Sequence, residues 1–238
     1  MRRLLLAAIL PLAACGNSAG GSPGIPGSGS GPARSYRVAD FTGVEVTGPD
    51  DVQISTGTGF SVRAEGDPGV LDKIRITKDG SRLRIARAEG FHFGLGRPTK
   101  VFVTMPRISD VSLRGSGDVE IDHVTGDQFD AAGSGSGDLT VHAAKLNNLH
   151  LAVSGSGDMA FSGEARSLQA AINGSGDIDA RHLTVNDANV SVSGSGDLNA
   201  DVKGAANVNL SGSGDVDLGD AARCQIAKAG SGSVRCGR

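Results

Sequence analysis

Alternating apolar and polar side chains recur at a regular interval in the C-terminal half of the chain. Each stretch follows a Gly-Ser-Gly-Asp tetrapeptide, and the residue directly after the Asp is always apolar. The residue two positions later is apolar too, while the one between them is mostly polar. The apolar positions are Val119, Leu139, Met159, Ile178, Leu198 and Val216, then Ile121, Val141, Phe161, Ala180, Ala200 and Leu218. This period of two predicts a β-strand with one buried face.

A second strand is predicted before each tetrapeptide. Its inward positions are Phe129, Leu149, Leu168, Leu151, Val190, Val208, Ile226, Val153, Ile172, Val192 and Leu210. Its outward positions are mostly polar, namely Asp130, His150, Gln169, Asn189, Asn207 and Gln225. Each repeat therefore contains a strand, a Gly-Ser-Gly corner, a second strand and a looser return.

The tetrapeptide occurs six times, at residues 115–118, 135–138, 155–158, 174–177, 194–197 and 212–215. A degenerate copy, Gly-Ser-Gly-Ser, follows at 230–233, and successive copies are 20, 20, 19, 20, 18 and 18 residues apart. A fixed period of this size is typical of a solenoid, in which each coil covers the apolar face of its neighbour. We therefore expect an all-β fold, with a β-solenoid of parallel coils over residues 111–238.

The corner sequence also suggests a role for its Asp. Two glycines separated by one residue permit positive φ angles or a close approach between coils. Stacked corners would align the side chains of Asp118, Asp138, Asp158, Asp177, Asp197 and Asp215, which we call the Asp column. We expect each carboxylate to accept hydrogen bonds from backbone N–H groups of its own or an adjacent corner, with no metal ion or other cofactor.

Calcium binding is the alternative for the Asp column. Gly-x-Gly-x-Asp followed by an apolar residue is half of the nonapeptide that binds calcium in repeat proteins. One Asp in each long coil, however, supplies too few oxygens for a 6–8-coordinate ion. The tetrapeptide is thus more typical of a structural corner.

Residues 36–110 have a different β pattern, with short alternating runs and no tetrapeptide. Residues 78–81, Lys-Asp-Gly-Ser, predict a hairpin turn, and residues 68–73 could form one helical turn. We expect this N-terminal β region to begin the same sheets and to cover the first coil, so that 36–238 is one continuous domain. The Gly-rich loop 89–98, with two Phe and a Leu, is either a mobile loop or a ligand-contacting lip.

The first residues have the features of a bacterial lipoprotein signal. Arg2 and Arg3 precede a short apolar stretch, and Leu12-Ala13-Ala14-Cys15 matches a lipobox, in which Cys15 is acylated, for example with palmitate. We expect residues 1–14 to be removed and residues 15–35, rich in Gly, Ser and Pro, to form a flexible tether without regular structure. An ordinary secretory signal with an incidental Cys is the alternative. Gly16 favours the outer membrane of the cell envelope, on its periplasmic face or at the cell surface.

Composition narrows the class of protein further. The 238 residues include 37 Gly, no Trp and one Tyr, so the core must be thin and aliphatic. The formal net charge is −3, which gives no indication of nucleic-acid binding. The five histidines, His92, His123, His142, His150 and His182, lack a matching metal-ligand pattern and are predicted to lie on the surface.

The two remaining cysteines, Cys224 and Cys236, fall at inward positions of the last coil. Cys224 takes the place of Phe129 in the repeat register, and Cys236 takes that of Leu218. An exported compartment permits a disulfide, which would staple the coil that has no successor. Two buried thiols are the alternative.

The signal, the Arg37-Val38-Ala39-Asp40-Phe41-Thr42-Gly43-Val44 segment, the Val101–Pro106 strand and the tetrapeptide repeats together resemble one family of exported bacterial proteins. It is the "putative auto-transporter adhesin, head GIN domain" family. The resemblance covers about residues 36–238 and implies a right-handed parallel β-helix, but no catalytic residues.

We therefore predict a non-catalytic, lipid-anchored binding or structural module with adhesin-like contacts to envelope glycan or protein. A hydrolase or lyase acting on polysaccharide is the alternative, because such enzymes also use β-helices. Such an enzyme would require one asymmetric cluster of carboxylates, whereas a motif that recurs six times is more typical of a structural role.

Overall fold

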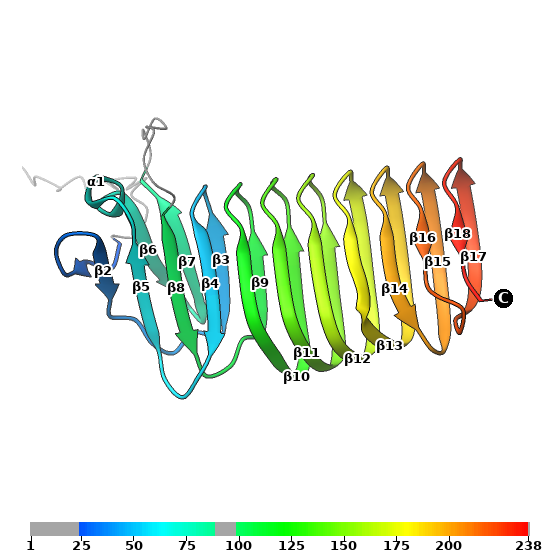
Figure 1. Cartoon of the computed structure of the whole chain (residues 1–238), viewed down its shortest axis with the longest axis horizontal. Coiled ribbons are helices and arrows are strands. Elements are labelled where there is room, and N and C mark those ends of the chain that lie inside the picture. The colour runs from blue at the N-terminus through cyan, green and yellow to red at the C-terminus, as the bar shows by residue number, and fades with distance from the viewer. Residues whose placement is uncertain (1–23, 89–98, 238) are drawn as a thin grey trace, which may run out of the picture.

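The structure is a computed structural model that describes residues 24–88 and 99–237. The described residues form one long sheet that winds around a thin core, together with a single short helix. The molecule is elongated, with a cap of antiparallel strands at one end and the C-terminus at the other (Figure 1). This confirms the predicted all-β solenoid of parallel coils.

Four long strands make the central coils, and shorter strands make the last ones. The long strands are β10 (Val119–Gly133), β11 (Leu139–Val153), β12 (Met159–Gly174) and β13 (Ile178–Gly194). The short ones are β14 (Leu198–Val202), β15 (Ala205–Gly212), β16 (Val216–Asp217), β17 (Arg223–Gly230) and β18 (Val234–Arg235). All of them pair in parallel with their counterparts one coil away.

The predicted inward columns form the core. Val119, Leu139, Met159, Ile178, Leu198 and Val216 are at most 2% exposed. Phe129 and Phe161 pack with their ring centroids 6.4 Å apart, between coils that otherwise contain aliphatic side chains. Ile226 holds the register of the buried Val208 but is 49% exposed, because no coil of the described residues covers it.

Two parallel coils precede the first tetrapeptide. Strands β3 (Gly43–Thr47) and β4 (Asp51–Thr56) form the coil that pairs with β9 (Asp110–Leu113) and β10. Strands β7 (Arg82–Arg87) and β8 (Lys100–Met105) pair with the other side of β3 and β4, again in parallel. The same continuous sheet thus runs from the N-terminal β region into the solenoid.

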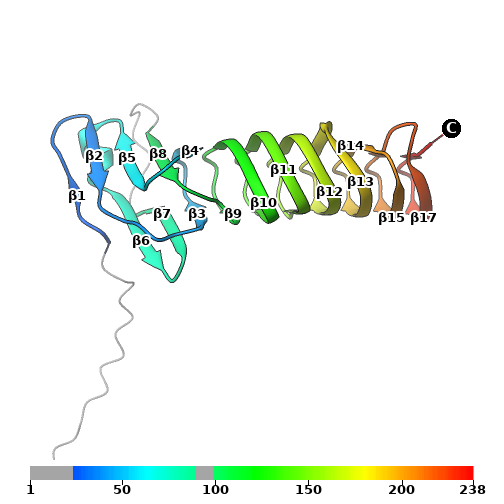
Figure 2. The same ribbon diagram turned by 90° about the horizontal axis from the view of Figure 1, so that it is seen from below.

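Antiparallel strands end the sheet at the N-terminal side, as Figure 2 shows. On one side, β6 (Ile74–Asp79) pairs with β7 through the predicted hairpin at Gly80. On the other, β5 (Ser61–Glu65), β2 (Ala33–Tyr36) and β1 (Gly27–Ser28) continue outward from β8. The predicted helical turn is α1 (Pro68–Leu71), capped by the Asp67 side chain. We call this assembly of β1, β2, β5, β6 and α1 the cap.

The structure corrects the extent of the expected tether. We expected no regular structure before residue 36, but β1 and most of β2 lie in that segment. Backbone pairing explains the difference, because β2 adds to the exposed edge of β5 and β1 adds to β2. A composition rich in Gly, Ser and Pro gives no indication that a strand edge is available for pairing. The signal, Cys15 and the loop 89–98 lie outside the described residues.

Candidate functional site

The corners stack, and their carboxylates link them. Each Asp of the column accepts a hydrogen bond from the backbone N–H at the same corner position one coil further on. The donors to Asp118, Asp138, Asp158, Asp177, Asp197 and Asp215 are Asp138, Asp158, Asp177, Asp197, Asp215 and Ser233, at 2.7–2.9 Å. The expected bonds therefore run to the adjacent corner.

Both glycines of the tetrapeptide are required by close contact between coils. A Cβ atom on Gly135 would lie 1.9 Å from the carbonyl oxygen of Gly115, and one on Gly137 would lie 2.2 Å from that of Gly117. The Gly115 carbonyl accepts hydrogen bonds from the N–H groups of Ser136 and Gly137, at 3.0 and 3.2 Å. The backbones approach so closely that a side chain has no room.

The sequence reasoning missed the first corner of the stack. Residues 48–51, Gly-Pro-Asp-Asp, occupy the corner position below 115–118, and the Asp118 N–H donates to Asp51 Oδ1 at 3.1 Å. The preceding Asp50 is 2% exposed and forms an ion pair with Arg87 of β7. The alternation in Val44-Glu45-Val46 and Val52-Gln53-Ile54 was the available signal, but the changed corner sequence concealed it.

The outer face of the sheet formed by β12, β13, β15 and β17 has an unusual composition. Three outward positions from each strand align in register and form what we call the grid. Its residues are Gln169, Ala171, Asn173, Asn189, Ser191, Ser193, Asn207, Asn209, Ser211, Gln225, Ala227 and Ala229. All twelve are amide, hydroxyl or methyl side chains, so the grid carries no charge and no large apolar group.

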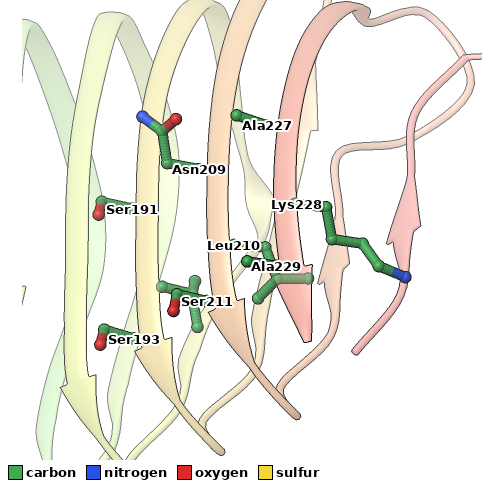
Figure 3. Close-up of a pocket in the computed structure, with 9 residues that line it drawn as sticks. Ser191, Ser193, Asn209, Leu210, Ser211, Ala227, Lys228 and Ala229 are labelled. Carbon is green, nitrogen blue, oxygen red and sulfur yellow. The ribbon is translucent and has the colours of Figure 1, made fainter. Parts of the chain in front are cut away.

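The grid is hollowed between its middle row and the row of Ser193, Ser211 and Ala229. A hollow of 300 Å³ lies over β13, β15 and β17, lined by Ser191, Asn209 and Ala227 among others (Figure 3). Towards the cap, a groove of 420 Å³ includes Ala132, Ala152 and Ala171 of the same row. The row of Gln169, Asn189, Asn207 and Gln225 carries longer side chains along one side of the hollow and the groove, which together we call the trough.

Amides link one wall of the trough. The Asn207 side-chain amide donates to Asn189 Oδ1 at 2.9 Å, between adjacent coils. Closer to the cap the same row becomes charged, where His150 Nδ1 lies 2.8 Å from Asp130 Oδ1 and Arg82 pairs with Asp110. The trough thus has a charged end near β9 and a neutral end at β17.

The histidines of the described part lie on the surface, as expected. His142 pairs with Glu120 at 2.7 Å, and His123 contacts Thr56 and Asp122. Across residues 24–88 and 99–237, no group of three or more His, Cys, Asp or Glu side chains is arranged to hold a metal ion. In the parallel register of β10 and β11, His123 stands opposite Ala143, the residue that follows His142.

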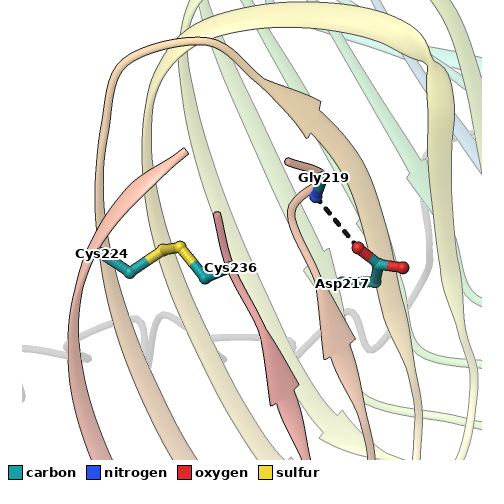
Figure 4. Close-up of a disulfide and its surroundings, with 4 residues drawn as sticks. All are labelled: Asp217, Gly219, Cys224 and Cys236. Atoms are coloured by element: carbon teal, nitrogen blue, oxygen red, sulfur yellow. Dashed lines mark hydrogen bonds between the residues drawn. A yellow bond between two sulfur atoms is a disulfide. The ribbon is translucent and has the colours of Figure 1, made fainter. Parts of the chain in front are cut away.

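The last coil contains a disulfide between Cys224 and Cys236, whose Cα atoms are 6.2 Å apart (Figure 4). Both residues are partly buried against the core. Beside them, the Gly219 N–H donates to Asp217 Oδ1 at 2.9 Å and fixes the preceding turn. Lys228 takes the register of the buried Leu210 and is exposed, so the final coil presents a charge where earlier coils present an apolar residue.

Two carboxylates outside the trough have lowered pKa values. Hydrogen bonds from the backbone N–H and the hydroxyl of Ser233 hold the pKa of Asp215 below its ordinary value. The side-chain hydrogen bond from Arg181 likewise lowers the pKa of Asp179. Both groups are thereby held in the charged form to lower pH. Within the described ranges, no helix is long and apolar enough to cross a membrane.

Comparison with solved structures finds the same fold in several bacterial proteins. A putative adhesin from Bacteroides fragilis NCTC 9343 superimposes with a TM-score of 0.81 at 21% identity, covering 85% of this chain and 95% of that one. A putative lipid binding protein from Parabacteroides distasonis ATCC 8503 has a TM-score of 0.67 at 18% identity, covering 88% and 97%. A putative adhesin from the same strain has a TM-score of 0.65 at 21% identity, covering 88% and 98%.

Curated proteins gave no match. Residues 40–222, by contrast, match a family through its sequence pattern, and the match includes the first coil, the tetrapeptide repeats and most of the grid. Because this range covers most of the chain, the protein belongs to the family described as "putative auto-transporter adhesin, head GIN domain".

Proposed function

We propose that this protein is a non-catalytic, adhesin-like module, anchored in the cell envelope through acylated Cys15, that binds neutral envelope glycan along the grid. Membership of an adhesin family supports the binding role. The observation that carries the proposal is the grid itself, in which twelve aligned outward positions have neither charge nor large apolar side chains.

The chemistry of the grid favours glycan over protein. The cores of protein interfaces are enriched in Tyr, Trp, Phe, Met and Arg, and none of these occurs in the grid. Asn, Gln and Ser side chains offer uncharged donors and acceptors that complement sugar hydroxyl and acetamido groups. Adjacent coils repeat these groups about every 4.8 Å, so a polymer can make many weak contacts at once.

The binding test uses the chain from Gly16 onward on an array of neutral and charged glycans. Asn209→Glu places a charge at the middle row of the grid, and we expect it to abolish binding of neutral polymers. Asn199→Glu adds the same charge to the outward side of β14, away from the grid, and should leave binding unchanged. Equal loss in both variants, or binding by neither wild type nor variants, would contradict the proposal.

The anchor has a separate test. Mass spectrometry of the protein extracted from membranes should find a diacylated or triacylated N-terminal Cys15. Cys15→Ser should release the chain from the membrane fraction. An unmodified chain beginning elsewhere would show that residues 1–15 are an ordinary secretory signal.

A further inference from the structure

Charge is divided unevenly between the two halves of the molecule. Residues 24–114 contain 13 Lys and Arg against 10 Asp and Glu, whereas residues 115–238 contain 8 against 16. The N-terminal half is therefore net positive, and the solenoid that carries the Asp column is strongly acidic. A surface with one sign of charge would attract one end and repel the other.

Basic side chains gather around a hollow of 290 Å³ in the cap. Arg34, Lys73 and Arg75 line it, and Asp72 is the one carboxylate among its lining residues. Arg34 forms an ion pair with Asp72 at 2.9 Å, while Lys73 and Arg75 are exposed and pair with no described carboxylate. The hollow thus has two cations more than anions, and the buried Tyr36 contributes to its lining.

The hollow lies where the chain enters the fold. Ile25, another lining residue, donates its N–H to the Ile76 carbonyl of β6 at 2.7 Å. Eight residues lie between Cys15 and Gly24, so their Cα atoms are nine residue steps apart along the chain. A fully extended chain of that length spans at most about 30 Å, so an acylated Cys15 would keep the cap close to the bilayer. The C-terminal coil lies at the opposite end of the long axis (Figure 2).

We propose that Lys73 and Arg75 dock the cap on the phosphate groups of an anionic phospholipid bilayer, so that the solenoid stands away from the membrane, while Arg34 stays bonded to Asp72 and to the carbonyl oxygens of Gly31 and Ala33. This inference rests on the proposed lipid anchor. The guanidinium group of Arg75 presents forked donors and the ammonium group of Lys73 a compact positive charge, both of which suit phosphate oxygens. The acidic solenoid would be repelled by the same surface, which disfavours a molecule lying flat on it.

The consequence for function is orientation. A tether alone would let the solenoid tumble at the surface, whereas a docked cap holds the grid perpendicular to the bilayer. Juxtamembrane Lys and Arg each contribute about 1 kcal/mol of attraction to anionic lipid, equal to about a fivefold change in partitioning. Removing two such residues should therefore weaken partitioning to the anionic bilayer about 30-fold.

The experiment uses the unacylated chain from Gly16 onward, which contains every described residue, in co-sedimentation with vesicles. We expect it to bind vesicles of phosphatidylglycerol mixed with phosphatidylcholine, and not vesicles of phosphatidylcholine alone. Lys73→Gln/Arg75→Gln should weaken the partitioning about 30-fold, and added salt should weaken wild-type binding. A thermal melt of each variant verifies that the fold is kept.

Arg166→Gln/Arg223→Gln is the matched control, because it removes two positive charges from the solenoid. We expect its binding to the anionic vesicles to stay close to that of wild type, because the solenoid does not contact the bilayer. Equal losses in the two double variants, binding to both vesicle types, or no binding at all would overturn the inference. Since no acyl group and no glycan is present, these outcomes are independent of the tests of Cys15 and of the grid.

Discussion

The carboxylate of Asp138 accepts a 2.8 Å hydrogen bond from the backbone N–H of Asp158, its counterpart one coil further along. The N–H of Asp138 in turn donates to Asp118 at 2.9 Å. Each Asp thus satisfies a donor that the next coil would otherwise leave without a partner at the corner. The column therefore joins successive coils, and it stabilises the fold by supplying acceptors for backbone N–H groups.

Removing one link should be measurable. Asp158→Ala leaves the Asp177 N–H without its acceptor, and we expect a loss of about 1–3 kcal/mol in the free energy of unfolding. Asp158→Asn keeps an acceptor oxygen and relieves repulsion within the column, so it should lose less. Asp127→Ala, which removes a carboxylate bonded only to exposed side-chain amide, is the control in urea denaturation. A loss for Asp158→Ala no larger than for the control would contradict this role.

Metal removal should leave the fold unchanged. The column carboxylates are bonded to backbone N–H groups, so their stabilisation needs no ion. EDTA is therefore expected to leave the melting temperature within experimental scatter. A large rise in melting temperature on adding calcium would show that the column binds the ion.

The corner glycines should tolerate no side chain. Gly135→Ala would force its Cβ against the Gly115 carbonyl, which belongs to rigid backbone, and we expect a loss of about 3 kcal/mol or failure to fold. Gly59→Ala is the matched control, since a Cβ there meets nothing within 4 Å. Circular dichroism melts compare the two. Equal stability of both variants would mean that the coils can separate at the corner.

Lowering the pH should destabilise the last coil by protonating Asp215. Its folded pKa is depressed by Ser233, so its contribution is complete above its unfolded pKa of about 3.9 and is lost as pH falls through the lower folded value. Ser233→Ala removes the hydroxyl but keeps the N–H, and should move the Asp215 pKa part of the way back towards its ordinary value. Carboxyl-carbon NMR titration measures both. An unchanged pKa in Ser233→Ala would exclude the hydroxyl as a cause.

Loss of the disulfide should affect the C-terminal end selectively. Cys224→Ala/Cys236→Ala opens a loop with a sequence separation of 12, which in the chain-entropy model is worth about 3 kcal/mol. Hydrogen exchange should accelerate in β17 and β18 and stay unchanged in β10, because each coil contacts only its neighbours. In the wild type, both thiols should resist alkylation after denaturation without reductant. Full alkylation under those conditions would show that the staple is absent.

Repetition explains why most of the fold could be predicted from the sequence. Six copies of one corner set the register, and the register alone placed Cys224 and Cys236 in the same coil and brought Lys228 to a core position. Where repetition stops, the prediction weakens. Ile226 has the pattern of a core residue, yet its burial depends on a following coil, and the described residues contain none beyond β17 and β18.

The parts that sequence reasoning missed depend on contacts distant in the chain. The corner at 48–51 is joined to Asp118 across 67 residues, so no local spacing reveals it. Strand β2 forms because β5 presents an open edge, which composition does not encode. The sequence placed Gln169, Asn189 and Asn207 at outward strand positions, but the observed strand pairing was needed to show that three such rows lie side by side in one uncharged face.

The separation of β4 from β10 implies an order of assembly. Closing the contact between Asp51 and Asp118 joins positions 67 residues apart, whereas later corners join positions 18–20 apart. The longer closure costs about 1 kcal/mol more in chain entropy. A chain that leaves the export machinery with its N-terminus first would complete that closure with the cap and β3–β4 already present as a template. Every later coil would then be added to a finished edge, and oxidation of Cys224 and Cys236 would be the closing step.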